Sequence, residues 1–129
     1  MKTKLHLTVT LCLCWLTGFT QVIDANTAYQ KAIELFEFKT NYEKDVSAYA
    51  YSINYVTQND TTFIYVIDID NVGWALVSAT ENAGPYFAYS MHSTIDLNEM
   101  PPATEMWLDY YKSISRHCMR NPHDMRFYQ

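Results

Sequence analysis

The sequence has little glycine, proline or cysteine. Its 129 residues include 3 glycines, 4 prolines and 3 cysteines. So few glycines cannot form a glycine-rich phosphate loop, and neither a nucleophile elbow nor a metal-binding helix motif occurs. Cys12 and Cys14 lie in an N-terminal apolar run, and only Cys118 lies beyond it. An internal disulfide framework is therefore excluded beyond that run, and packing has to hold the fold together.

Basic residues are missing from the middle of the chain. No lysine or arginine occurs between Lys44 and Lys112, whereas nine acidic residues do, and the formal net charge is -5. A surface of this kind repels the phosphate backbone of nucleic acids and suits a basic or neutral partner. We therefore expect no nucleic-acid binding.

The first residues have the layout of a secretory signal peptide. Lys2 and Lys4 precede an apolar run over residues 5–19, and a small residue follows at a plausible cleavage point. The run is too short and too rich in threonine for a convincing membrane span. We predict a signal peptide over residues 1–25, a mature domain over residues 26–129 and a secreted or periplasmic location.

Lipidation is the alternative for this N-terminal segment. A lipid on Cys12 or Cys14 would make the protein a membrane-anchored lipoprotein, the one case in which we expect a membrane contact. Leucine precedes both cysteines, where a lipoprotein signal needs a small residue. The signal peptide is therefore the favoured interpretation.

Two segments have apolar residues at helical spacing. Thr27 and Gln30 form a candidate capping box, so we predict a first helix over Ala28–Lys39. A second helix is expected to begin at Met100-Pro101-Pro102 and to end at Pro122, with acidic residues near its start and basic residues toward its end, as the helix macrodipole favours. Its apolar residues at helical spacing are Met106, Trp107, Tyr110, Tyr111 and Ile114.

Strand patterns occupy the region between these helices. Side chains alternate over residues 49–55, and further strands are predicted over Thr62–Ile69, Trp74–Ala79 and Tyr86–Met91, with a turn at Asp70–Gly73. Glycine suits that turn because it accepts a positive φ. We predict an α+β domain with a four-stranded antiparallel sheet, an N-terminal helix and a C-terminal helix packed on the sheet's apolar face.

The chemistry-bearing residues do not assemble into a catalytic pattern. A thiolate at Cys118 next to His117 would be nucleophilic, but adjacent helical residues point about 100° apart and cannot form a dyad. A metal site from His117, Cys118, His123 and Asp124 matches no standard ligand spacing and spans Pro122. We predict no enzyme activity, no cofactor and no metal.

Two further sets have both a functional and an ordinary interpretation. Asp68 and Asp70 resemble paired carboxylates, but acids beside a hairpin turn are usually solvated. Four tyrosines of the predicted sheet could form an aromatic recognition surface, although half-buried cross-strand pairs are more common. They are Tyr49, Tyr51, Tyr55 and Tyr65.

The stretch from Thr61 to Tyr111 resembles the prodomain of streptopain-type cysteine proteases and the related stand-alone inhibitors, the Spi-like protease inhibitors. The shared order is an aromatic-rich strand, a glycine turn followed by an aromatic, an apolar strand ending in Val-Ser, a short strand, an acidic loop with proline and an aromatic helix. In this chain these features are Phe63–Ile67, Gly73-Trp74, Leu76-Val77-Ser78, Tyr89-Ser90, Ile95-Asp96, Pro101-Pro102 and Trp107–Tyr111.

The resemblance implies a bacterial protein that inhibits a streptopain-like cysteine protease and has no small-molecule substrate. Inhibition in trans is expected, because the sequence ends at Gln129, where a zymogen would continue into a catalytic domain. In such prodomains the connection between the last strand and the final helix presses on the catalytic cleft. The alternative is a non-inhibitory, propeptide-like folding partner or binding module.

Carried over by position, the inhibitory loop is Ser93–Pro102, and two prolines restrict its flexibility. Asn98, Glu99 and Met100 are expected to project at its tip. The partner-binding residues implied by the resemblance are Asp96, Asn98, Glu99, Met100, Pro101 and Pro102.

Overall fold

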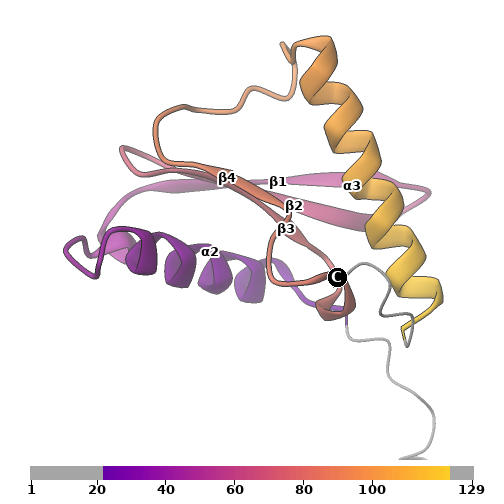
Figure 1. Ribbon diagram of the computed structural model, residues 1–129, viewed down its shortest axis with the longest axis horizontal. Helices are drawn as coiled ribbons and strands as arrows, with labels where there is room; N and C mark the ends of the chain where they lie inside the picture. Colours follow the sequence, from indigo (N-terminus) through magenta and orange to yellow (C-terminus); the bar gives the residue numbers. More distant parts are fainter. Residues whose placement is uncertain (1–21, 123–129) are drawn as a thin grey trace, which may run out of the picture.

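The computed structural model describes residues 22–122 of the chain. Two helices and a four-stranded sheet make up an α+β domain, as predicted (Figure 1). The elements in chain order are α2 (Ala25–Lys39), the 3-10 turn η1 (Val46–Ala48), β1 (Tyr51–Gln58), β2 (Thr61–Ile69), β3 (Gly73–Ser78), the 3-10 turn η2 (Glu81–Ala83), β4 (Ala88–Ser90) and α3 (Pro102–Arg120).

Helix α2 begins three residues earlier than predicted. The side chain of Asp24 accepts a hydrogen bond of 2.7 Å from the backbone N–H of Thr27, so Asp24 is the N-cap. The predicted capping box of Thr27 and Gln30 is therefore wrong, because both residues already lie inside the helix. The preceding Ile23 is buried, and its N–H donates to the carbonyl of Ala79 at 2.9 Å. Residues 22–24 thus belong to the fold.

The strands form an antiparallel meander in the order β1-β2-β3-β4. Asn59 and Asp60 connect β1 to β2 with φ angles of 52° and 62°, the left-handed pair that a two-residue hairpin needs. Strand β1 begins at Tyr51, later than its alternating pattern indicated, because the chain before it forms η1. Strand β4 has three residues, so its prediction over Tyr86–Met91 was too long.

Both faces of the sheet are apolar, and one helix covers each face (Figure 1). Tyr65 and Ile67 of β2 face a core cluster that includes α2, whereas Ile64 and Val66 face a second cluster that includes Leu108 of α3. The sequence analysis expected the sheet to have one apolar face, whereas the structure has two. Burial on both sides explains why β2 is a continuous apolar run rather than an alternating one.

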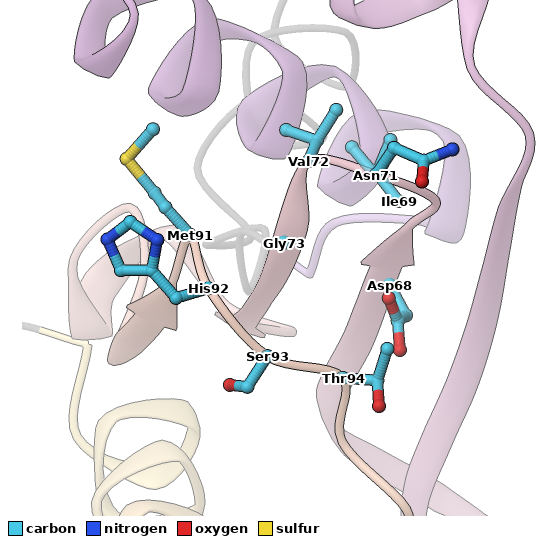
Figure 2. A pocket seen from close by; sticks show the side chains of 9 residues that line it. All are labelled: Asp68, Ile69, Asn71, Val72, Gly73, Met91, His92, Ser93 and Thr94. Atoms are coloured by element: carbon cyan, nitrogen blue, oxygen red, sulfur yellow. The ribbon is translucent and has the colours of Figure 1, made fainter.

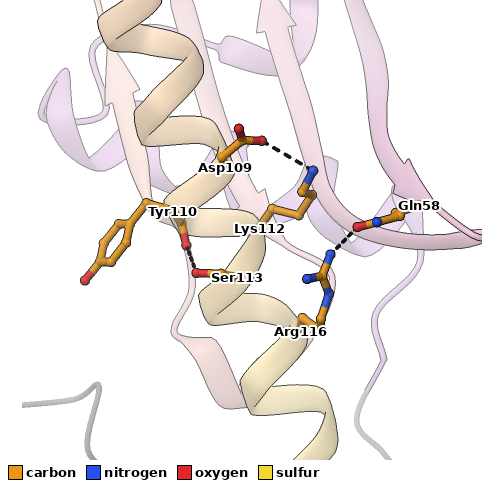
Figure 3. Close-up of polar contacts among 6 residues, drawn as sticks. All are labelled: Gln58, Asp109, Tyr110, Lys112, Ser113 and Arg116. Carbon is orange, nitrogen blue, oxygen red and sulfur yellow. Dashed lines mark hydrogen bonds and ion pairs between the residues drawn. The ribbon is translucent and has the colours of Figure 1, made fainter.

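Helix α3 attaches to the sheet mainly through its C-terminal half. The Ser115 hydroxyl, fully buried, donates to the carbonyl of Phe63 at 2.7 Å and lies 3.2 Å from the hydroxyl of Ser78. The guanidinium of Arg116 donates to the side chain of Gln58 (Figure 3) and lies 5.1 Å from the ring centroid of Phe63. These contacts fix the end of the helix farthest from the β4–α3 connection.

Within residues 22–122, neither helix combines the length and the hydropathy that a membrane span requires.

Candidate functional site

The connecting loop, residues 91–101 between β4 and α3, contains most of the residues predicted to contact a partner. Ile95, Leu97 and Met100 are partly buried and pack against the second core cluster. Asp96 and Asn98, together with Glu99, alternate with them and are exposed. The apolar side chains therefore fasten the loop to the sheet while the polar ones face solvent. Met100 differs from the expectation, because it packs inward instead of projecting at the tip.

Polar contacts hold the first part of this loop. The indole N–H of Trp74 donates to the hydroxyl of Ser93 at 3.1 Å, and the hydroxyls of Ser90 and Ser93 lie 2.9 Å apart. Farther along, the backbone N–H of Ile95 donates to a carboxylate oxygen of Asp68 at 3.5 Å. Strands β2 and β3 thus both contribute side chains that position the loop.

The tip is held by a local turn and by proline. The carboxylate of Asp96 accepts a hydrogen bond of 2.8 Å from the backbone N–H of Asn98, which closes an Asx turn. Pro101 is the N-cap residue of α3 and Pro102 is its first residue, and both are exposed. Because the tip is restrained in the free protein, binding requires little further ordering of the backbone.

A polar hollow of about 640 Å³ lies at the base of the loop, between the β2–β3 turn and the segment after β4 (Figure 2). Gly73 is required here, because a Cβ at this position would lie 1.9 Å from the carbonyl oxygen of Ser90. Figure 2 shows Asp68 and His92 on different sides of the hollow, so these two side chains form no acid–base dyad. The lining residues are Asp68, Ile69, Asn71, Val72, Gly73, Met91, His92, Ser93 and Thr94.

Asp68 supports the loop rather than forming a carboxylate pair with Asp70. Burial raises the pKa of Asp68, the hydrogen bond from Ile95 opposes that shift, and the charge of Asp70 adds to it. Asp70 lies beyond the end of β2, where its backbone N–H donates to the carbonyl of Ala50. Asp70 therefore lies outside the strand that carries Asp68.

The other predicted candidates, His117 and Cys118, are adjacent residues near the end of α3. Cys118 is completely buried and His117 is partly exposed. Of the proposed metal ligands, His123 and Asp124 lie outside the described residues, and within residues 22–122 no group of three or more His, Cys, Asp or Glu side chains could hold a metal ion.

The tyrosines of the sheet mostly pack against one another and against α2. The rings of Tyr29 and Tyr51 stack at 3.8 Å, and those of Tyr55 and Tyr65 meet edge to face at 5.6 Å. The hydroxyl of Tyr65 donates to the carbonyl of Ile23 at 2.8 Å. Tyr55 and Tyr65 thus form the expected cross-strand pair, whereas Tyr51 packs on helix α2 instead.

Sequence reasoning missed an exposed apolar set on the first half of α3. Met106, Trp107 and Tyr110 were expected to pack on the sheet, but more than half of each side chain is exposed. Their neighbours Leu108 and Tyr111 provide the inward contacts instead. The sequence did contain a sign of this exposure. Apolar residues at consecutive positions span more of the helix circumference than one packed face can cover.

A comparison with protein families identifies the family to which the chain belongs. The model of the Spi protease inhibitor family matches residues 20–114, about three quarters of the sequence. The matched segment contains the whole sheet, α2, the connecting loop and the first part of α3. No curated protein and no solved structure matches the chain. The chain belongs to the Spi protease inhibitor family.

Proposed function

We propose that the protein inhibits a streptopain-like cysteine protease in trans, with the connecting loop placed across the active-site cleft. Membership in the family indicates a protease inhibitor and hence a protease partner. The observation that supports the loop as the contact is its combination of fixed ends and exposed polar residues. Asp96, Asn98 and Glu99 face solvent, while the residues around them are anchored to β2, β3 and α3.

The loop is suited to occupying a cleft because it is restrained before binding. Its inward apolar residues, the Asx turn at Asp96 and the two prolines each reduce the number of conformations that binding would have to remove. In this proposal the protein acts by binding alone and uses none of its own side chains for catalysis.

We also propose that the protein works outside the cytoplasm, after removal of its N-terminal segment. The buried Ile23 and the helix cap Asp24 constrain where that removal can occur. Cleavage after Ala25 would remove both residues from the fold. A cleavage site before Val22 would keep both residues, so we propose cleavage there in place of the site after Ala25.

The test is a titration of the purified protein into a streptopain-like protease that cleaves a fluorogenic peptide, with papain measured in parallel. We expect stoichiometric loss of the streptopain-like activity and no effect on papain. Binding without inhibition would support the folding-partner alternative instead. Absence of both binding and inhibition would contradict the proposed function.

A pair of variants tests the role of the loop. Asn98→Ala combined with Glu99→Ala is expected to weaken inhibition at least tenfold without changing the circular dichroism spectrum, because both side chains are exposed. The matched control is Gln30→Ala combined with Glu34→Ala, an exposed amide and carboxylate on α2. Equal inhibition by the two double variants would exclude the loop tip as the contact.

A further inference from the structure

The first half of α3 carries an exposed apolar surface next to the connecting loop. We call Met106, Trp107 and Tyr110 the helix patch; these residues are 65%, 54% and 51% exposed. Figure 1 shows that this part of α3 extends past the sheet, and none of the helices and strands within residues 22–122 lies on its outer side. A shallow depression of about 330 Å³ is lined by the three residues. Exposed aromatic and methionine side chains grouped in this way are characteristic of protein-binding sites.

The rings of the patch are held in place by a series of aromatic contacts. Trp107 stacks on Tyr111 at 6.0 Å and meets the edge of Tyr110 at 5.9 Å. Tyr111 in turn stacks on Phe87, beside β4, at 5.0 Å. Trp107 is therefore linked through Tyr111 to the sheet, and its ring is restrained before any partner arrives. A restrained tryptophan loses little conformational entropy on binding, which suits it to anchor an interface.

The helix patch is continuous with the connecting loop. A groove of about 250 Å³ lies between α3 and the sheet, and Ile95 and Met100 of the loop line it together with Trp107. The loop and the helix patch therefore border the same groove.

The charged residues that directly precede the patch in the chain are acidic. Glu99 lies in the loop and Glu105 in the first turn of α3, and both are exposed. The next basic residue along the chain, Lys112, forms a salt bridge of 3.3 Å with the carboxylate of Asp109. The guanidinium of Arg116 donates a hydrogen bond to the side chain of Gln58 (Figure 3). The patch therefore combines exposed apolar side chains with the neighbouring acidic residues Glu99 and Glu105, which we call its acidic border.

We propose that the helix patch is the anchoring part of the protease interface, and that it receives an apolar surface of the protease bordered by lysine or arginine side chains. The inference rests on the proposed function and identifies the chemistry of the partner. The charge complementarity selects this occupant. A second copy of the same chain would place its own acidic border against this one, and like charges in contact oppose association.

Trp107→Ala tests the anchor, with Phe38→Ala as the matched control. Phe38 is a 62% exposed aromatic residue on α2, which covers the other face of the sheet. We expect Trp107→Ala to weaken protease binding about 30-fold or more, as at a central interface aromatic, and Phe38→Ala to leave it unchanged. Met106→Ala, which involves no ring contact, serves as a second variant in case Trp107→Ala perturbs the helix. Circular dichroism and sedimentation verify folding and oligomeric state.

Glu105→Gln tests the acidic border, with the exposed Glu34→Gln of α2 as its control. If the partner is basic, Glu105→Gln slows association with the protease several-fold at low salt, and the difference disappears at high salt. Equal association rates for the two variants at low salt would overturn the basic partner surface.

The outcomes separate this inference from the proposed function. Full inhibition and binding by both Trp107→Ala and Met106→Ala, with loss in the loop variant, would overturn the inference and leave the function intact. Wild-type binding without inhibition would overturn the proposed function. In that case, comparing the protease affinities of the wild type and Trp107→Ala would still test whether the helix patch anchors the interface. Absence of any wild-type binding would overturn both. Dissociation of a dimer by Trp107→Ala would show that a second copy occupies the patch, which also overturns the inference.

Discussion

The two helices use their apolar residues in opposite ways. Helix α2 has 15 residues and buries six of them, including Tyr29, Ile33 and Phe36. Helix α3 is longer, with 19 residues, yet it buries only Leu108, Ser115 and Cys118. Its large apolar residues near the N-terminal end remain exposed instead. Helix α2 therefore serves mainly to stabilise the sheet, whereas α3 combines a docked C-terminal half with a projecting half that is available to a partner.

The largest effect is expected in the middle of α2. Phe36 is fully buried in the first core cluster, so Phe36→Ala leaves a cavity and should lower the free energy of unfolding by about 3–5 kcal/mol. Phe38→Ala, two residues farther along the same helix, should change it by less than about 0.5 kcal/mol because Phe38 is exposed. Urea denaturation of both variants measures the difference. Similar losses would contradict the assignment of α2 as the stabilising helix.

The next effect concerns the residues that lead into α2. A chain beginning at Asn26 lacks Ile23, which is buried and bonded to Ala79 and Tyr65, and lacks the helix cap Asp24. Relative to a chain beginning at Val22, it should lose about 3 kcal/mol through the lost apolar burial, the unpartnered tyrosine hydroxyl and the missing cap. Thermal unfolding of the two chains measures this loss, and equal melting temperatures would show that residues 22–25 do not support the helix.

A smaller loss of stability is expected at Ser115, where α3 is attached to the sheet. Ser115→Ala removes the buried hydroxyl that bonds Phe63 and Ser78, and should cost about 1–2 kcal/mol of unfolding free energy. Ser113→Ala is the control, because that hydroxyl is exposed and bonds only the carbonyl of Tyr110 within the same helix (Figure 3). Chemical denaturation that finds no difference between the two would mean that the polar contacts do not hold α3 to the sheet.

The smallest expected effect is a difference between Asp24 and Asp68 in how each makes the stability depend on pH. Asp24 caps α2, and its bond from Thr27 lowers its pKa below 3.8, so its contribution is present above that value and is lost as the pH falls. Burial raises the pKa of Asp68, so the folded protein holds that proton more tightly than the unfolded chain. Stability therefore falls as the pH rises from 3.8 through the raised pKa of Asp68.

The variant Asp68→Asn removes this second dependence. Its unfolding free energy should rise relative to that of the unmodified protein as the pH increases above 3.8, and denaturation at a series of pH values measures the difference. A difference that stays constant over this range would show that Asp68 is not desolvated in the folded state.

Much of the fold followed from the sequence because its signals are local. Period-two alternation identified β1, the turn at Gly73 separated the apolar strands β2 and β3, and the prolines at its start marked the second helix. The start of α2 was missed because Thr27 is also a good capping residue, and only the position of Ile23 against Ala79 favours Asp24 as the cap. The continuous apolar run of β2 contained the information that both faces of the sheet are covered.

The site was less predictable, because burial at the loop and at α3 depends on where the sheet ends. Apolar spacing alone cannot distinguish Trp107, which is more than half exposed, from Leu108, which is buried against the sheet. The inward orientation of Met100 likewise results from the groove between α3 and the sheet, which forms only after the strands pair. Ser115 and Cys118, two of the three buried residues of α3, are small and were not among the apolar residues found at helical spacing.

The central claim is that the connecting loop and the projecting half of α3, rather than α2, hold the protease. Hydrogen exchange measured by mass spectrometry, on the protein alone and with a streptopain-like protease, tests this most directly. We predict slower exchange of backbone amides over residues 93–110 in the complex and unchanged exchange over α2. New protection confined to α2 or β1, with residues 93–110 unaffected, would contradict the account.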